Sequence, residues 1–179
     1  MNNPYPRAVP LSSVSIDDVY WNRYTKLISE AVLPYQWEIL NDRIPDAPPS
    51  FCVQNFRIAA GEISGKRQGA VFQDSDAAKW LEAVAYSLAA VPDPELEKTA
   101  DGLIDLIGRA QCEDGYLNTY FTLVDPEGRW ANLTEGHELY CAGHLIEAAA
   151  AYFESTGKKK LLDIARRFAD LLCRVFGPE

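Results

Sequence analysis

Hydrophobic residues recur at helical spacing along most of the chain. Within residues 15–33 the apolar positions are three or four residues apart, as in an amphipathic helix: Val19, Tyr20, Tyr24, Leu27, Ile28 and Ala31. Ser15 or Asp17 could cap the start of this helix, and Pro34 is expected to interrupt it. The pattern therefore predicts a first helix that ends near residue 33.

The same spacing predicts six further helices. Two short ones are expected at 35–44 and 51–63, and four long ones at about 76–91, 94–111, 137–155 and 159–175. A polar, aromatic loop is expected at 113–136. Alternating apolar and polar residues, the pattern of a strand, occur only in short loop stretches. The predicted fold class is therefore all-α.

The last four helices form two similar helical hairpins. When the chain is aligned with itself without a gap so that Glu82 lies on Glu147, Asp105 lies on Asp170. The same alignment places Leu106 on Leu171, Arg109 on Arg174 and the turn "PDP" on "GKK". A helical hairpin that repeats buries its apolar face by stacking on its neighbours. Stacked hairpins with long loops suggest a toroid, the α/α barrel, in which the loops at one end build a pocket.

Composition narrows the class of protein. The chain has 179 residues, of which 47% are hydrophobic and 24% charged, and this suits one globular domain. Its net charge of -9 argues against binding to nucleic acid or an anionic membrane, because both need clustered Lys and Arg. The start has no apolar signal region, no stretch is long enough to span a membrane, and the four cysteines form no CxxC pair. We therefore expect reduced thiols and a cytoplasmic protein.

Both histidines lie in the stretch "GHELYCAGHLIEA". His137, Cys141 and His144 are spaced so that they share one helix face, and a His–Cys–His zinc site is geometrically conceivable. The alternative is that Cys141 packs as a small hydrophobe and His144 is a hydrogen-bonded core residue. His137 differs, because it opens the helix beside the long loop, where a ligand could be reached. Glu138 lies in the first turn of this helix, where its negative charge would interact favourably with the helix dipole.

Two other clusters combine polar and aromatic side chains. In "FQDSDAAKW", Asp74 and Asp76 either cap a helix or supply carboxylates that accept hydrogen bonds from sugar hydroxyls or act as an acid/base pair. In "CEDGYLNTYF", Tyr116 follows a turn and either stacks on a sugar face or seals its hairpin. The residue types alone leave both alternatives open.

The motifs together resemble those of glycoside hydrolase family 127, the β-L-arabinofuranosidase-like proteins. In order, they are "YQW", "AAGE", "VFQDSDAAKWLEA", "DPEL", "RAQ…DGYLNT", "HELYCAGHLIEAA" and "FGPE". The resemblance implies an α/α six-hairpin barrel followed by β-sandwich domains. It also implies a retaining exo-glycosidase with a zinc-bound cysteine nucleophile, a glutamate acid/base, and a zinc site of one Glu and three Cys.

The chain departs from this family in one respect: it has no Cys–Cys pair and no Glu-x-Cys. We therefore assign no catalytic residue and no metal ligand, and we expect zinc only in the complete family member. The resemblance implies that His137 binds the sugar, and we add four further candidate sugar-binding residues: Gln73, Asp74, Asp76 and Tyr116.

We expect residues 1–14 to be extended and residues 15–179 to form about half of the six-hairpin barrel. Such a chain would be the N-terminal half of a catalytic domain, inactive alone, whose parent enzyme removes a terminal L-arabinofuranose. Its exposed edges would favour a homodimer or higher oligomer. The alternatives are another α/α-barrel sugar enzyme, such as a uronyl hydrolase or epimerase, and a non-catalytic helical-repeat binding or assembly module.

Overall fold

A computed structural model describes residues 9–178 of the chain, and its regular elements in this range are all helical. Their order is η1 (Leu11–Ser13), α1 (Val19–Leu27), η2 (Ile28–Val32), α2 (Leu33–Leu40), α3 (Cys52–Ala59), α4 (Asp74–Ala90), α5 (Pro94–Ala110), α6 (Thr119–Leu123), η3 (Pro126–Gly128), α7 (Glu138–Thr156) and α8 (Lys160–Phe176). The all-α prediction is confirmed, and each of the four long helices lies within two residues of its predicted bounds.

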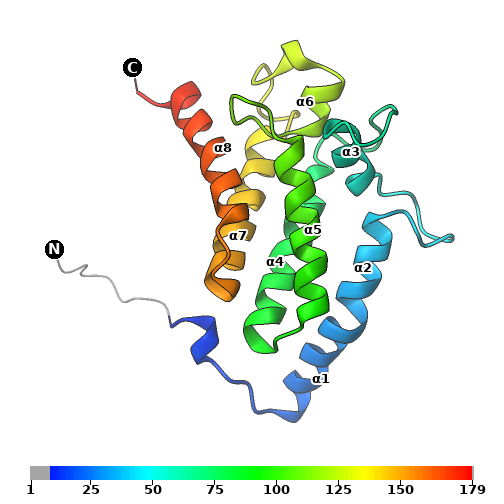
Figure 1. The fold of residues 1–179 in the computed structure, drawn as a ribbon, viewed down its shortest axis with the longest axis vertical. Helices are drawn as coiled ribbons and strands as arrows, with labels where there is room; N and C mark the ends of the chain where they lie inside the picture. Colours follow the sequence, from blue (N-terminus) through cyan, green and yellow to red (C-terminus); the bar gives the residue numbers. More distant parts are fainter. Residues whose placement is uncertain (1–8, 179) are drawn as a thin grey trace.

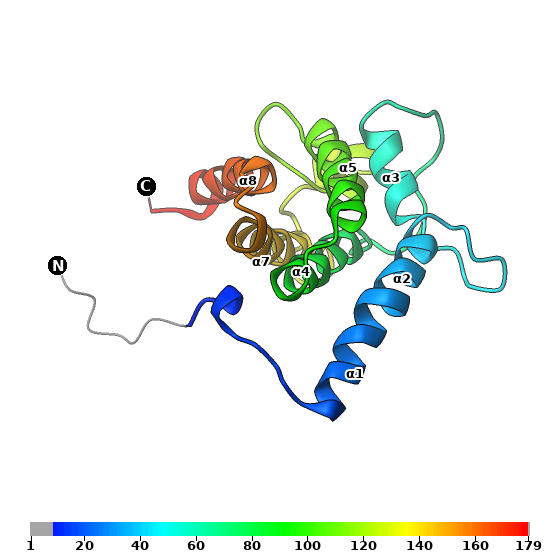
Figure 2. The ribbon, with the colours of Figure 1, turned by 60° about the horizontal axis from the view of Figure 1, so that its bottom comes forward.

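The helices lie in two layers (Figure 1, Figure 2). One layer contains α1 with α2, then α4, then α7, and the other contains α3, α5 and α8. Helix α4 packs along α7 and α2, whereas α5 contacts α3 and α8. This curved, two-layered row of hairpins is the arrangement expected for part of an α/α barrel.

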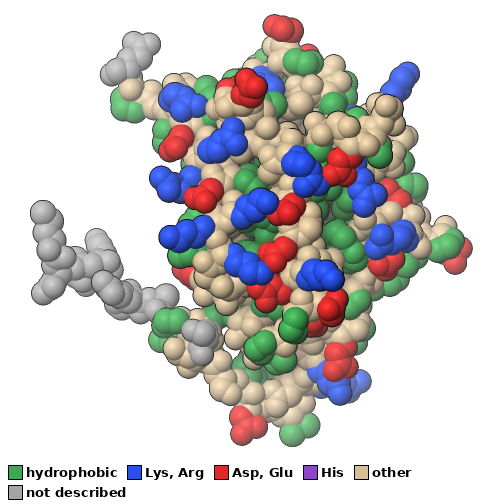
Figure 3. Space-filling view, in the orientation of Figure 1, with side chains coloured by type: hydrophobic (Ala, Val, Ile, Leu, Met, Phe, Trp, Pro, Cys, Tyr) green, Lys and Arg blue, Asp and Glu red, His purple; other side chains and the backbone are tan. Residues whose placement is uncertain are grey.

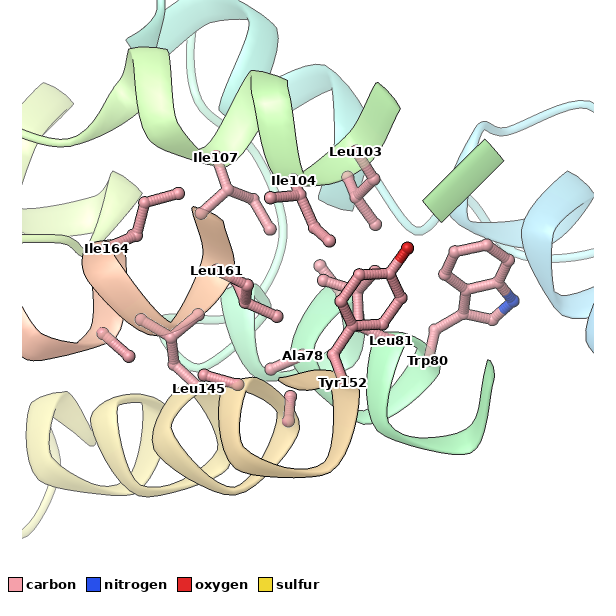
Figure 4. Packing of buried hydrophobic residues seen from close by; sticks show 14 of the residues in the cluster. Ala78, Trp80, Leu81, Leu103, Ile104, Ile107, Leu145, Tyr152, Leu161 and Ile164 are labelled. Atoms are coloured by element: carbon pink, nitrogen blue, oxygen red, sulfur yellow. The ribbon is translucent and has the colours of Figure 1, made fainter. Parts of the chain in front are cut away.

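The core lies between the two layers (Figure 4). Ile104 and Ile107 of α5 face Leu81 of α4, and Leu161 of α8 closes the same space. Helices α4 and α7 also bury many alanines, which let two helices approach closely: Ala77, Ala78, Ala85, Ala142, Ala148, Ala149 and Ala151. The two repeated hairpins are thus one packed unit, as the sequence repeat predicted.

The start of the first helix differs from its prediction. Asp18 caps it, since its carboxylate accepts a hydrogen bond from the backbone N–H of Trp21 at 2.9 Å, so neither Ser15 nor Asp17 is the cap. The helix also continues past Pro34, with η2 as a π-helical turn just before it. A wider turn tolerates a residue that has no N–H to donate, so the chain passes from α1 to α2 without a break.

Three other segments differ from their predicted lengths or structure. Helix α3 ends at Ala59, and Gly61 follows with a positive φ of 71°, so the predicted helix over 51–63 is shorter. The predicted loop at 113–136 contains α6 and the 3-10 turn η3. The predicted extended segment 1–14 contains the turn η1, and its residues 1–8 lie outside the described range.

The face formed by α5 and α8 carries interspersed charges of both signs (Figure 3). Lys158 contacts Asp101 at 2.5 Å and Glu97 at 2.6 Å, and Lys160 contacts Asp105 at 2.5 Å. These pairs link the start of α8 and the turn before it to α5 across the outer layer. None of the helices in residues 9–178 combines the length and apolarity needed to cross a bilayer.

Candidate sugar-binding site

The candidate site lies where α4 and α7 both begin, beneath the long loop that connects α5 to α7 (Figure 1). Contacts across the chain hold these starts together. The thiol of Cys141 on α7 approaches the backbone oxygen of Phe72 at 3.7 Å, and Phe72 comes just before α4. This end of the layer therefore brings together segments that the sequence separates widely.

Asp74 fixes the long loop to α4. Its two carboxylate oxygens accept hydrogen bonds from the backbone N–H and the hydroxyl of Thr119, each at 2.6 Å. The side chain is buried, and this burial raises the pKa of Asp74, while the Thr119 hydrogen bonds oppose the shift. The carboxylate thus bonds the loop rather than capping its own helix, and the helix-cap interpretation of Asp74 is wrong.

Glu138 anchors the other end of the loop. This fully buried carboxylate accepts hydrogen bonds from the Tyr116 hydroxyl and from the Trp130 backbone N–H, the latter at 2.8 Å. The guanidinium of Arg129 lies 3.9 Å from the centre of the Tyr116 ring, on its face. The sequence placed Glu138 only in the first turn of a helix and gave no sign of this role, because its partners lie in an irregular loop.

Tyr116 is buried by the same contacts. Its relative exposure is 0%, and its ring packs edge-on against Trp130 and Phe168. Burial and the adjacent Glu138 raise the pKa of its hydroxyl well above the ordinary value. Of the two alternatives that the sequence left open, Tyr116 therefore seals its hairpin and offers no exposed face on which a sugar could stack.

Gln73 and Asp76 line a cleft of about 550 Å³ next to the start of α4. The Gln73 amide donates a hydrogen bond to Asp76 at 2.7 Å, and the Lys79 ammonium lies 3.6 Å from the same carboxylate. Pro48, Pro49 and Trp80 supply apolar walls of this cleft. Polar groups on a partly apolar wall can bind sugar hydroxyls and also contact the less polar faces of a sugar ring.

His137 occupies a special backbone position immediately before α7. Its φ is 53°, in the left-handed region, and its Nδ1 lies 2.8 Å from the backbone oxygen of Glu135. A side chain on the preceding Gly136 would meet the Asn132 oxygen at 2.7 Å, so this tight approach needs glycine. The hydrogen bond to the Glu135 oxygen requires a proton on Nδ1, so in a neutral ring Nε2 is left as a hydrogen-bond acceptor.

Two aromatic rings that the sequence did not single out flank His137. The Phe72 ring centroid lies 5.1 Å from the imidazole centroid, and the Tyr140 ring centroid lies 5.8 Å from it. Both rings are partly exposed, at 41% and 44%. Phe72 directly precedes Gln73, so His137 and the cleft that Gln73 and Asp76 line are neighbours. The structure thus brings His137, Gln73 and Asp76 to one end of the layer, whereas Asp74 and Tyr116 hold the loop from within.

Cys141 and His144 have different surroundings. Cys141 is buried, as expected, and burial raises the pKa of its thiol to about 12. His144 is only half-buried, with its Nδ1 3.6 Å from a Glu147 oxygen, so the interpretation as a hydrogen-bonded core residue is wrong. Within the described residues, His137, Cys141 and His144 do not gather their ligand atoms, so a His–Cys–His zinc site does not form.

Comparison with known proteins gives consistent matches. The family model described as "Beta-L-arabinofuranosidase, GH127 catalytic domain" matches residues 13–179. A non-reducing end β-L-arabinofuranosidase of Bifidobacterium longum subsp. longum is 44% identical, and the alignment covers 93% of this chain and 28% of that protein.

Two solved structures are also similar. The crystal structure of a GH127 β-L-arabinofuranosidase from Geobacillus stearothermophilus T6 has 60% identity and a TM-score of 0.92, covering 93% of this chain and 26% of that one. A second GH127 β-arabinofuranosidase has 34% identity and a TM-score of 0.81, with the same coverage of both chains. The chain therefore spans about a quarter of the length of the relatives it matches.

Proposed function

The chain belongs to glycoside hydrolase family 127, and we propose that it supplies the sugar-binding N-terminal part of a catalytic barrel. Its parent activity would be that of a retaining exo-β-L-arabinofuranosidase, which removes a terminal L-arabinofuranose. The family match favours this activity over that of a uronyl hydrolase or an epimerase. The observation that carries the proposal is the position of His137 between two partly exposed aromatic rings, beside the cleft of Gln73 and Asp76.

Each of these groups would have a defined role toward a furanose ring. The Nε2 of His137 would accept a hydrogen bond from a sugar hydroxyl, because Nδ1 is engaged by Glu135. Asp76 accepts and Gln73 donates, so together they suit a pair of vicinal hydroxyls. Phe72 and Tyr140 present apolar ring surface to the less polar face of the sugar.

The remaining chemistry would come from elsewhere in a longer protein. We propose that this chain alone binds the sugar but does not cleave it, because the resemblance assigns the nucleophile, the acid/base and the zinc ligands to residues without counterparts here. The family's zinc site of one Glu and three Cys would then belong to the complete family member. The alternative for the isolated chain is a non-catalytic binding module. We also propose that the protein is cytoplasmic.

The proposal is tested by titrating the chain with methyl β-L-arabinofuranoside and following the two histidine rings by NMR. We expect the sugar to shift the His137 ring resonances more than those of His144, whose ring contacts Tyr140. His137→Ala should abolish the sugar-dependent shifts of residues 72–76, whereas the control His144→Ala should keep them. Equal shifts at both histidines, or shifts at residues 72–76 that survive in His137→Ala, would refute the assigned site.

A second assay addresses catalysis. Incubation with an aryl β-L-arabinofuranoside should release no phenol above the uncatalysed rate. Turnover that disappears in His137→Ala would show that the chain holds a complete active site. The proposal that the catalytic residues lie elsewhere in a longer protein would then be wrong.

A further inference from the structure

Three potential metal ligands meet on the surface formed by α4 and α7, beyond Tyr140, whose ring packs edge-on against that of His144 with the centroids 4.6 Å apart. One carboxylate oxygen each of Glu82 and Glu147 and one ring nitrogen of His144 lie within 4.8 Å of one another. Glu82 comes from α4, and the other two residues come from α7. Among residues 9–178 this is the only such group of three His, Cys, Asp or Glu side chains.

The repeat explains why these residues meet. Glu82 and Glu147 occupy equivalent positions in the two hairpins, and α4 and α7 pack side by side, so the two carboxylates become neighbours. His144 and Glu147 are three residues apart on one helix, a spacing that places both side chains on the same face. In the interior of helical bundles, a Glu and a His three residues apart bind metals together with a Glu from a neighbouring helix. Here the same residue types meet on a solvent-exposed face.

The charges of the cluster are not balanced within the described residues. Neither Glu82 nor Glu147 has a salt bridge to Lys or Arg there, and two nearby carboxylates repel each other. The Nδ1 of His144 is inaccessible to solvent and has no hydrogen-bond partner, because the Glu147 oxygen is 3.6 Å away. A divalent cation would supply both the missing charge and a partner for this nitrogen.

One contact already orients a ligand. The Tyr86 hydroxyl donates a hydrogen bond to Oε1 of Glu82 at 2.9 Å, and the carboxylate raises the pKa of Tyr86. Hydrogen bonds of this kind, from residues behind the ligands, fix carboxylates in metal sites. Glu147 is exposed, so an ion could enter from solvent, and water could complete its coordination.

We propose that Glu82, His144 and Glu147 bind one divalent transition-metal ion, with Zn²⁺ as the representative. One imidazole nitrogen and two carboxylate oxygens favour such an ion over Mg²⁺, which prefers oxygen ligands and retains its water. The site is distinct from the family's zinc site of one Glu and three Cys, and it links α4 to α7. Its existence does not depend on the proposed sugar binding.

The experiment is a calorimetric titration of the metal-free, reduced chain with ZnCl₂ and, separately, MgCl₂. We expect one Zn²⁺ per chain, with Mg²⁺ binding at least about tenfold more weakly. Glu82→Gln, His144→Ala and Glu147→Gln should each weaken Zn²⁺ binding by roughly tenfold or more. Matched controls are His137→Ala for the histidine and Glu154→Gln for an exposed carboxylate of the same helix, and both should bind as the unchanged chain does.

Histidine NMR and a thiol variant identify the ligands directly. Zn²⁺ should shift the His144 ring resonances and not those of His137, and the exposed thiol variant Cys173→Ser should bind normally. Loss of binding in Cys173→Ser, equal loss in His137→Ala and His144→Ala, or no binding by the unchanged chain would each overturn the proposal. Circular dichroism of every variant confirms that it is folded, so a loss of affinity reports on the ligands.

Discussion

The Asp74 carboxylate holds both the backbone N–H and the hydroxyl of Thr119, a residue 45 positions further along the chain. This pair of 2.6 Å hydrogen bonds joins the first turn of α4 to the start of α6. Because the loop between α5 and α7 has little regular structure, such side-chain contacts decide where it lies. The conformation of the candidate sugar-binding end therefore depends on this buried acid.

Removal of this carboxylate should destabilise the fold. Asp74→Ala leaves the Thr119 N–H and hydroxyl without their partner in a buried position, at a cost of about 1–3 kcal/mol in the free energy of unfolding. Urea denaturation measures the change. Asp170→Ala, an exposed aspartate of α8, should stay within about 0.5 kcal/mol of the unchanged chain. Equal losses in both variants would show that the Thr119 contact contributes no specific stability.

The pH dependence of stability should carry the signature of Asp74. Burial raises its pKa in the folded state, so the folded chain keeps this proton to higher pH than the unfolded chain does. The resulting stabilisation is complete below the unfolded pKa of about 3.9 and is lost as pH rises through the folded pKa. The unfolding free energy of the unchanged chain minus that of Asp74→Asn should therefore fall as pH rises above about 4.

Urea denaturation at a series of pH values measures this difference, and Asp170→Asn is the control, for which we expect no such fall. A difference that grows with pH would show that the Thr119 hydrogen bonds outweigh burial and lower the pKa of Asp74.

Tyr116→Phe should destabilise the loop by removing a hydroxyl and nothing else. The buried Glu138 then loses one of its two hydrogen-bond donors, at a cost of roughly 1.5–3 kcal/mol for a bond to a charged group. Thermal unfolding followed by tryptophan fluorescence is a suitable measurement, because Trp130 packs against Tyr116. Tyr35→Phe removes the hydroxyl of an exposed tyrosine and should leave the melting temperature unchanged. A comparable loss in Tyr35→Phe would contradict the assigned role.

Self-association is expected through the uncovered first helix. Helix α1 contains no buried residue, and Val19, Tyr20 and Trp21 are 92%, 59% and 59% exposed. Apolar surface of this kind usually marks an interaction site, and pairing of like surfaces gives a two-fold dimer. Light scattering at micromolar concentration should report a dimer or higher oligomer, and Trp21→Glu should shift it toward monomer. A monomer that binds no hydrophobic dye would show that this face needs no partner.

The sequence predicted the regular parts of the fold better than the site. Periodicity located α4, α5, α7 and α8 because each buries a continuous apolar stripe, and the repeat predicted that the hairpins stack. It did not show that Asp74 bonds Thr119 or that Glu138 bonds Tyr116, because those contacts join a helix to an irregular loop. A helix-opening acid looks the same in sequence whether it caps the helix or anchors a distant segment.

The same limit applied to the second histidine. His144 has the spacing of a buried residue on an alanine-rich helix, yet it lies where two carboxylates from different hairpins converge. Only the lateral packing of α4 on α7 brings Glu82 to it. The sequence repeat showed that Glu82 and Glu147 occupy equivalent positions in the two hairpins. It did not show that the two side chains are neighbours, because that depends on how the hairpins pack side by side.

The π-helical turn η2 also takes up one extra residue between α1 and α2. Leu33 donates its backbone N–H to the Ile28 oxygen, five residues back, so this turn holds one residue more than an α-helical turn. Deleting one residue within Ile28–Val32 would therefore leave Tyr20, Trp21 and Tyr24 on nearly the same face, whereas a deletion just before Ile28 would rotate them by about 100°. The wider turn thus makes the direction of this exposed aromatic surface insensitive to the loss of a residue at one place in the helix.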